Sequence, residues 1–541
     1  MILPQLPNRV QKKESQIFKL KGINLSDDYQ DGSLRECINF STRRYPYMAT
    51  RRRRKELEGY ENISSITSWN KLVAVRGTDL LYDGEVVGQV TEGEKQFAIV
   101  NTKLAIMPDK KYLDVSTKTL VDMASSVEPT GNFVFKAPKA KTDTSEAQDQ
   151  YVQFSSQSTL NFTNYFKVGD GITISGCKNE HNNLVLTIKT VEAKKITFET
   201  MGVDSKNFVD ATENGTIKFE RKVPDFDFIC EADNRVWGCV SSEQTIYASA
   251  LGDPTNFYDY SGTSTCSYAV PVGSEGNFTG CHKLGSSVLF FKGNTLHKVV
   301  GDKPSTYAVY AYSIEGVKEG CHKSMQIINE TLLYMSSNGV YAYSGGNTNY
   351  ISSALGSQKY SNGVAGTDGS KYYLSCKDEQ GKYNLFVYDL KNSIWMREDD
   401  TNAIDFTRNG DELYFLSDNG KIYSTDSLDE KALFEWALQF NPFYESTFYN
   451  GRMTSILSGK KKYSKVMIRG ELPFGSHMVV ITKEDDGIWK EQGRFYGSKT
   501  GLVTVVIALN RCDKFELRLE GKGQFTLIDL ARIYSIGSER D

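Results

Sequence analysis

The stretch RVWGCVSSEQTIYASA at residues 235–250 decides how we interpret the rest of the chain. Two short apolar runs, 235–240 and 244–248, flank the polar turn Ser241-Ser242-Glu243, and this is the pattern of a β-hairpin. A second stretch, SVLFFKGNTLHKVV at 287–300, has Gly293-Asn294 between its runs, a pair that favours a tight turn with positive φ. We therefore expect two antiparallel hairpins joined by a long loop.

The hairpin recurs along the chain. Similar units begin near residues 331, 371 and 411, so that successive starts from 235 onward are about 40 to 52 residues apart. A period of about 40 to 50 residues with paired short strands is typical of propeller blades, each of which is a four-stranded sheet. Two further hairpins between 62 and 115 bring the expectation to about six or seven blades.

Other parts of the chain have different patterns. Short strands separated by glycine turns around 166–177 predict a small SH3-like β-barrel that interrupts the repeat. Six alternating strands between 464 and 533 predict a β-sandwich. The predicted chain is all-β, in five parts: an extended N-terminal arm at 1–60, the first blades at 61–126, the inserted module at 127–222, the remaining blades at 223–430, and the C-terminal sandwich at 431–541.

Composition narrows the class of protein. Of 541 residues, 39% are hydrophobic and 24% charged, which is ordinary for a globular chain, and 31 Tyr and 28 Phe favour strands. No run of about 18 apolar residues exists, so we expect no membrane span. The first residues do not resemble a signal peptide, and nine scattered cysteines without a CxxC pair indicate reduced thiols. We expect synthesis in a cytoplasm.

One charge cluster stands out at the N-terminus. It consists of six arginines: Arg43, Arg44, Arg51, Arg52, Arg53 and Arg54. Clustered arginines can bind nucleic-acid phosphates. They also occur on strand edges and on surfaces that face a partner. Because the whole chain carries a formal charge of −3 and no row of aromatic residues accompanies the cluster, we favour a contact between subunits.

The sequence offers no coherent catalytic set. Gly-Cys-His-Lys occurs twice, at 280–283 and 320–323, which we expect to be equivalent positions on two blades. The Cys-His pair could serve as a nucleophile and its base or as metal ligands, or it could have a structural role only. Carboxylates that a glycosidase would need are present, but their spacing marks no pair; they are Asp225, Asp227, Asp253 and Asp259. No phosphate-binding loop occurs. We predict no catalytic, cofactor-binding or metal-binding residues, and no enzyme.

Several segments resemble a known family. They are NRVWGC at 234–239, IYASALGDPTNF at 246–257, GSEGNFTG at 273–280, KGINL at 21–25, YPYMATRR at 45–52 and RCDKFELRLEGKG at 511–523. These are similar to bacteriophage and prophage virion proteins of the propeller-bearing tail nozzle class, also called tail tubular protein B or stabilisation proteins.

The resemblance implies a structural role in the virion tail. It implies a ring, usually of six copies, below the portal and adaptor complex, whose lumen passes the genomic DNA and whose rim contacts other tail proteins and possible tail fibres. Two alternatives remain open. One is a receptor-binding protein at the tail tip that recognises glycans, and the other is a propeller glycoside hydrolase.

Overall fold

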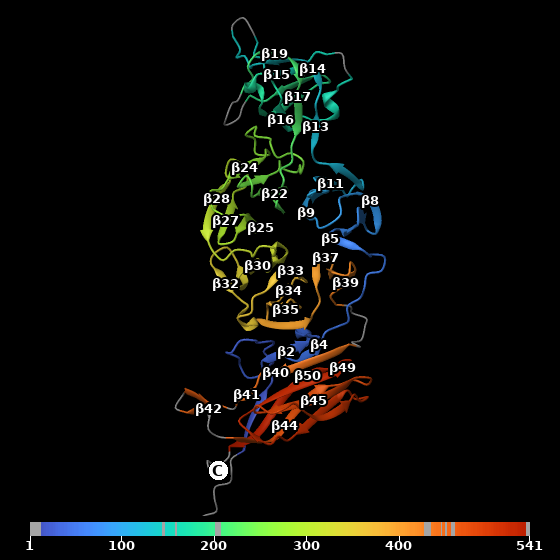
Figure 1. Ribbon diagram of the computed structural model, residues 1–541, viewed down its shortest axis with the longest axis vertical. Helices are drawn as coiled ribbons and strands as arrows, with labels where there is room; N and C mark the ends of the chain where they lie inside the picture. Colours follow the sequence, from blue (N-terminus) through green and yellow to red (C-terminus); the bar gives the residue numbers. More distant parts are fainter. Residues whose placement is uncertain are drawn as a thin grey trace, which may run out of the picture. The chain divides into compact units, whose positions relative to one another are not determined.

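The computed structural model divides the chain into two compact units. Unit 1 contains residues 1–58, 338–342 and 349–541, and unit 2 contains residues 59–337 and 343–348. The described residues are 12–142, 146–156, 159–200, 207–426, 434–444, 446–449, 452–455 and 460–536. They form strands and short 3-10 turns, as expected for an all-β protein (Figure 1). Within these ranges no helix has the length and hydropathy needed to cross a membrane.

The two predicted hairpins of the central region are confirmed. Each belongs to a four-stranded antiparallel sheet whose strands follow sequence order. The first sheet contains β21 (Phe228–Ala232), β22 (Arg235–Val240), β23 (Thr245–Ala248) and β24 (Tyr268–Pro271). The second contains β25 (Phe278–Leu284), β26 (Ser287–Lys292), β27 (Thr295–Val300) and β28 (Ala308–Ser313). Side chains from both sheets form one core around Trp237 and Phe290.

The prediction for one turn was wrong. Gly293, between β26 and β27, does not adopt positive φ. The left-handed conformation occurs instead at Asp233 and Asn234, in the turn between β21 and β22 (φ 51° and 58°), and at Gly285 between β25 and β26 (φ 57°). Asp and Asn tolerate this region because their short side chains hydrogen-bond locally, and two consecutive positive φ values match the twist of a tight hairpin.

Two more four-stranded sheets precede this pair in unit 2. They are formed by β5 (Ile63–Trp69), β6 (Lys71–Arg76), β7 (Asp79–Tyr82) and β8 (Glu85–Gln89), and by β9 (Gln96–Val100), β10 (Lys103–Met107), β11 (Lys111–Asp114) and β12 (Thr119–Asp122). A shared core of Val, Leu and Ile side chains lies between them. A further sheet has the order β29 (Gln326–Ile328), β30 (Thr331–Ser336), β31 (Gly339–Tyr343) and β32 (Thr348–Tyr350).

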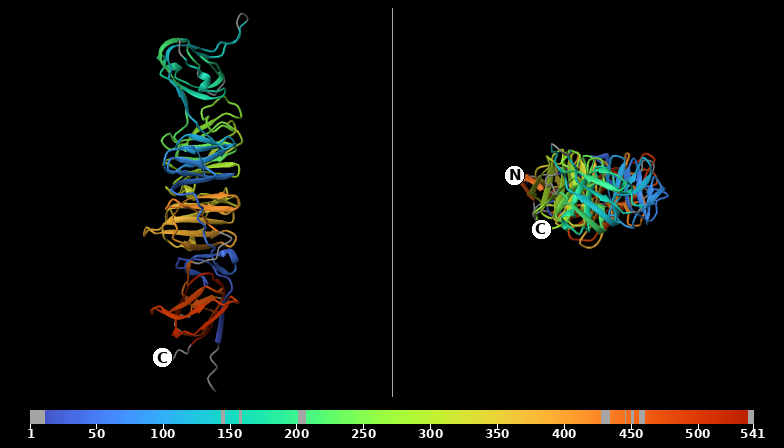
Figure 2. Two further views of the ribbon diagram at one scale, coloured as in Figure 1. Left: turned by 90° about the vertical axis from the view of Figure 1, so that its right-hand side faces the viewer. Right: turned by 90° about the horizontal axis from the view of Figure 1, so that it is seen from above.

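The inserted module is an antiparallel barrel. Its strands are β13 (Ser125–Val127), β14 (Thr130–Lys136), β15 (Tyr151–Phe154), β16 (Gly171–Ser175), β17 (Val185–Val191), β18 (Lys195–Phe198), β19 (Ala211–Thr216) and β20 (Lys218–Arg221). The sheet closes because β13 runs on into β14 and pairs with β20, while β19 runs on into β20 and pairs with β14. Figure 2 shows this barrel from a second side. Its core is rich in phenylalanine, including Phe133, Phe154 and Phe219.

Unit 1 contains the last two sheets of the repeat. One is β33 (Ser361–Thr367), β34 (Lys371–Lys377), β35 (Tyr383–Asp389) and β36 (Ile394–Asp399); the other is β37 (Ala403–Asn409), β38 (Glu412–Ser417) and β39 (Ile422–Ser424). Residues 51–57, here called the strap, run beside β39 at the open edge of the second sheet, where Glu56 forms an isolated antiparallel bridge with Tyr423. Leu57 N donates to Ile422 O and Ser424 N to Lys55 O, both at 2.8 Å.

The C-terminal strands lie close to where the sequence predicts them. One sheet contains β44 (Lys461–Glu471), β47 (Leu502–Ile507), β48 (Arg511–Cys512) and β50 (Thr526–Ile536); the other contains β40 (Glu435–Phe440), β41 (Phe443–Tyr444), β45 (His477–Glu484), β46 (Lys490–Tyr496) and β49 (Lys514–Lys522). Their inward side chains share one core, in which Phe515, Leu517 and Leu519 are fully buried as the alternation predicts. A separate hairpin is formed by β42 (Ser446–Tyr449) and β43 (Arg452–Ser455).

The predicted N-terminal arm is instead part of these two sheets. β1 (Lys12–Ile17) and β4 (Met48–Thr50) pair with β50, β4 also pairs with β3 (Phe40–Ser41), and β2 (Leu34–Ile38) pairs with β40. Figure 1 shows the blue strands β2 and β4 among the red strands of the C-terminus. Burial of Phe40 and Met48 in the shared core explains why the arm folds back onto its own chain. Residues 1–11 of the predicted arm lie outside the described residues.

Short 3-10 turns connect several of these strands. They are η1 (Thr42–Arg44), η2 (Phe162–Asn164), η3 (Glu180–Asn182), η4 (His322–Ser324) and η5 (Ser353–Leu355). η1, η2 and η3 are each capped by a side-chain oxygen of the preceding residue, Ser41, Asn161 and Asn179 respectively.

Candidate functional site

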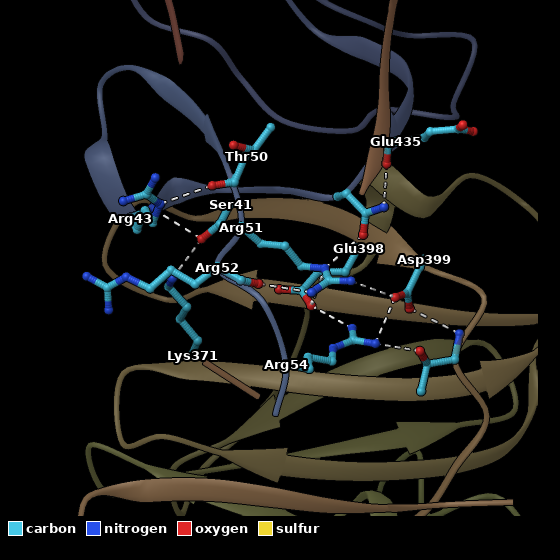
Figure 3. Close-up of polar contacts among 12 residues, drawn as sticks. Ser41, Arg43, Thr50, Arg51, Arg52, Arg54, Lys371, Glu398, Asp399 and Glu435 are labelled. Carbon is cyan, nitrogen blue, oxygen red and sulfur yellow. Dashed lines mark hydrogen bonds and ion pairs between the residues drawn. The ribbon is translucent and has the colours of Figure 1, made fainter. Parts of the chain in front are cut away.

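Two of the six predicted contact arginines point into unit 1. Arg54 donates to Glu398 at 2.8 Å, to Asp399 at 2.7 Å and to the Thr401 hydroxyl at 2.6 Å (Figure 3). Arg51 donates to the Asn39 amide oxygen at 2.8 Å and lies 3.5 Å from Asp399. Because Glu398 and Asp399 end β36, these arginines fasten the strap to the neighbouring sheet.

In this cluster the two arginines, Arg51 and Arg54, and the two carboxylates, Glu398 and Asp399, neutralise each other. Burial lowers the pKa of Arg51 to about 10, an effect increased by Arg54 and opposed by the two carboxylates. Burial alone would raise the pKa of Asp399, but Arg54, Arg51 and hydrogen bonds from Thr401 bring it below its usual range. Each charge is stable in this buried place because its counterions are present.

The other four arginines lie nearer the solvent. Arg43 is exposed and its Nε donates to the Thr50 carbonyl at 3.1 Å, and Arg44 forms an ion pair with Glu471. Arg52 lies 3.4 Å from Asp426, with both side chains partly exposed, and Arg53 is exposed. The subunit contact stays a prediction for all six arginines. In the structure, Arg51 and Arg54 make their contacts within the chain, and Arg44 pairs with Glu471.

A second organised site was not predicted as such. Arg235, 1% exposed, donates to three carbonyl oxygens of one loop: Ser249 at 2.7 Å, Cys266 at 2.6 Å and Ser264 at 3.0 Å. The planar guanidinium suits this task because its donors form a rigid fork. Arg235 thus fixes residues 249–267, here called the bracket loop, to the sheet that contains β22.

The bracket loop holds the inserted module through specific polar contacts. The Asn256 side chain donates to Gly169 O at 2.8 Å and accepts from Gly171 N at 3.1 Å. Asp259 accepts from the Thr187 hydroxyl at 3.0 Å, and Asp253 forms an ion pair with Lys167 at 2.6 Å.

Close packing accompanies these hydrogen bonds. A Cβ atom on Gly171 would lie 2.1 Å from the Tyr258 carbonyl, so only glycine permits this approach. Phe257 of the loop is fully buried in a core shared with β22 and β23. The segment GDPTNF, which carries part of the family resemblance, is therefore a mechanical joint between a sheet and the inserted barrel.

An ion pair strengthens the joint from the barrel side. Arg221, at the end of β20, donates to Asp170 at 2.8 Å and to the Met123 carbonyl at 3.2 Å. Burial raises the pKa of Asp170 despite Arg221, whereas Lys167 and Thr255 lower the pKa of Asp253 against the effect of its burial. The two aspartates are thus held in different environments on the two sides of the joint.

The two Gly-Cys-His-Lys segments are not equivalent. His282 lies in β25, where its Nδ1 is 2.8 Å from the Lys283 carbonyl and burial lowers its pKa. His322 begins η4, and its Nε2 lies 3.4 Å from Glu94; the pKa of Glu94 falls to about 2 because His322 and Lys323 lie beside it, with burial opposing. The segments differ because one enters a strand and the other a turn. In the described ranges no group of three or more His, Cys, Asp or Glu side chains is arranged to hold a metal ion.

The four carboxylates considered for glycoside hydrolysis have separate roles. Asp253 and Asp259 belong to the bracket loop, Asp227 accepts from Ser241 N at 2.6 Å in a turn, and Asp225 pairs with Lys110 at 2.7 Å at the surface. Paired carboxylates that flank one bond are the requirement for glycosidases. The contacts of these four residues give them bracing and capping roles.

No family model and no curated protein matches this sequence. Among solved structures, BamB from Moraxella catarrhalis has a TM-score of 0.33 and 13% identity, covering 71% of this chain and 98% of BamB. Hsv2 from Kluyveromyces lactis has a TM-score of 0.28 and 11% identity, covering 43% of this chain and 70% of Hsv2. An exo-β-1,3-galactanase from Phanerochaete chrysosporium, solved with galactose, has a TM-score of 0.21 and 9% identity, covering 55% and 92%.

At these TM-scores the likenesses carry no argument about the fold or the function of this chain. The strand order of the small sheets, four antiparallel strands in sequence order in all but one of them, is the pattern that the repeat predicts.

Proposed function

We propose that this protein is a structural component of a bacteriophage tail that forms a ring, of six copies, as a nozzle or hub below the portal and adaptor complex. Its lumen would pass the genomic DNA during ejection, and its rim would contact other tail proteins and tail fibres. The family resemblance of the segments around 234–280 supports this proposal, together with the small antiparallel sheets in sequence order.

In this proposal the seven small sheets close into one propeller. The strap supports closure, because residues 55–57 hydrogen-bond to β39 of the last sheet shortly before the chain enters the first sheet. The inserted barrel is of the SH3-like type, and the two C-terminal sheets form a β-sandwich. Propellers have broad loop faces that suit head-to-tail contacts in a ring.

The observation that carries the proposal is the joint at the bracket loop. Buried and partly buried polar groups are used there to fix a barrel to a sheet, through Arg235, Asn256 and Arg221 among others. Breaking such contacts leaves buried polar groups without partners, which costs free energy. The barrel is therefore fixed rigidly to the sheet that contains β22. A protein that transmits contacts within a particle needs this stiffness, whereas a binding loop needs freedom to adapt.

The overall charge agrees with a DNA conduit. A formal charge of −3, with the two most buried strap arginines neutralised internally, gives little attraction for phosphate. DNA that must pass through a lumen should not be held tightly by it.

The test is the oligomeric state of the full chain and its place in the particle. Native mass spectrometry and negative-stain images of the purified protein should give closed rings, and antibodies should label the tail of virions. Monomers at high concentration, together with unlabelled virions, would refute the proposal. Specific binding on a glycan array, with label at the tail tip, would favour the receptor-binding alternative.

A further inference from the structure

Among the described residues, two exposed edge strands lack the features that normally prevent strand pairing. β28 (AVYAYS) is the last strand of its sheet and β47 (LVTVVI) is the edge strand of a C-terminal sheet. Each is six residues long and contains no charged residue, proline or glycine. Natural proteins usually protect a sheet edge with charges, proline, bulges or very short strands, because free backbone groups recruit another strand.

The neighbouring edges of the same chain show that protection. Among the last strands of the other small sheets, β8 contains Glu85, β12 contains Asp122, β24 ends in Pro271 and β32 has three residues. β46, the edge strand of the second C-terminal sheet, contains Lys490, Glu491 and Arg494. The first strands β5 (ISSITSW) and β9 (QFAIV) also lack charge, proline and glycine, but none of their residues is exposed. β28 and β47 differ from all of these strands in being both uncharged and exposed.

The exposed side chains of the two edges carry no charge, and most of them are apolar or aromatic. On β28, Tyr310 and Tyr312 are 51% and 46% exposed; on β47, Leu502 and Val506 are 68% and 53% exposed, with Thr504 between them. Within the described part of the chain, β28 pairs with β27 and β47 pairs with β44. Tyrosine is enriched at protein interfaces, and aromatic residues opposite aliphatic or β-branched residues stabilise neighbouring strands.

We propose that these two edges pair between copies of this chain, the β28 edge of one copy adding to the β47 edge of the next. This inference rests on the proposed ring, whose interface it specifies. The strands match in length, and neither brings a charge that the contact would have to desolvate. Because the two edges differ, the contact is head-to-tail, which is the kind that generates rings rather than isolated pairs.

Strand addition would give each contact a row of backbone hydrogen bonds and a specific direction. The tyrosines of β28 would lie over the exposed face of β47, covering Leu502 and Val506. In this arrangement the neutral edges carry the assembly contact, and the arginines of the strap stabilise each copy internally.

Charge placed on the two edges tests the inference by assembly of the full-length protein. The single variants Tyr310→Lys and Thr504→Lys should each weaken ring formation about 100-fold, because each would put a charge into the paired edges. The double variant Tyr310→Lys with Thr504→Lys should stay dissociated, whereas Tyr310→Glu with Thr504→Lys should recover most of the assembly. Val86→Lys on β8 is the matched control, since Val86 is 53% exposed on an edge that already contains Glu85.

The readouts are native mass spectrometry for assembly and the melting temperature for folding. The substituted side chains are exposed, so each variant monomer should melt at the wild-type temperature. Conservative Tyr310→Phe and Thr504→Val variants should leave the rings intact. If wild-type rings form and the charged variants assemble like Val86→Lys, the edge pairing is wrong while the ring proposal stands. If one edge alone is sensitive and the charge-swapped pair does not recover, pairing between these two edges is also refuted. If the wild-type chain forms no ring, both proposals fail.

Discussion

Replacing Arg54 with alanine should loosen the strap selectively. Arg54 is 11% exposed and bridges Glu398 and Asp399, which are 7% and 16% exposed. Removing one partner of such a buried set leaves carboxylates without adequate compensation, at a cost of about 3 to 5 kcal/mol. Because Arg51 remains near both carboxylates, we expect the lower value, about 3 kcal/mol.

Hydrogen exchange of the backbone amides measures the loss of stability in the strap itself. The amides of Leu57 and Ser424 are bonded across the strap and β39, so they report on local opening of this pairing. A loss of about 3 kcal/mol corresponds to exchange about 100-fold faster. Arg52→Ala is the control: its ion pair with Asp426 is partly exposed, so it should contribute less than about 1 kcal/mol. Equal effects of the two substitutions, or less than a tenfold change for Arg54→Ala, would refute the reasoning.

The same pair has a pH dependence with a defined sign. The pKa of Asp399 is below its usual range in the folded protein, so its stabilising contribution is present above the unfolded-state pKa and is lost as pH falls through the lower folded value. Without Arg54, burial should raise the pKa of Asp399. Protonation of Asp399 at lower pH then removes its uncompensated buried charge and so stabilises the folded variant. The difference in the stability of the strap between wild type and Arg54→Ala, measured by hydrogen exchange, should therefore become smaller as pH is lowered from 7 toward 4.

Three further predictions concern other parts of the molecule. Arg235→Met leaves three carbonyls of the bracket loop without their donor, so hydrogen exchange in residues 249–267 should accelerate at least tenfold, and an unchanged loop would contradict the role given to Arg235. Gly171→Ala should displace the inserted barrel from Tyr258 and expose the Gly171 amide to exchange, whereas Gly215→Ala, whose Cβ would meet only one atom at 4.0 Å, should behave as wild type. None of the nine cysteines forms a disulfide, and burial raises the pKa of Cys37 to about 12, so iodoacetamide at pH 8 should label the native protein slowly and the denatured protein at all nine sites. Rapid labelling of the native protein would show that the cores are open.

Local patterns predicted many of the strands, although not those of the N-terminal segment. The alternation of Phe515, Leu517 and Leu519 with polar neighbours is a property of consecutive residues, and it placed a strand that the structure confirms. The hairpin repeat likewise predicted the small antiparallel sheets, because turn residues and apolar runs alternate along the chain at short range. The motif GDPTNF was recognisable as a resemblance, although its role as a joint was not.

The sequence by itself determined that this chain is all-β and where most of its strands run, because both depend on the period of apolar residues. Only the tertiary structure decided which distant groups meet. Arg54 and Asp399 are 345 positions apart, and β1 pairs with β50 at the other end of the chain. Such pairings depend on loop closure and on the burial of complementary faces, neither of which a local pattern contains. For the same reason the sequence could not distinguish the six arginines from one another. In the structure two of them, Arg51 and Arg54, are buried beside carboxylates, and the other four lie nearer the solvent.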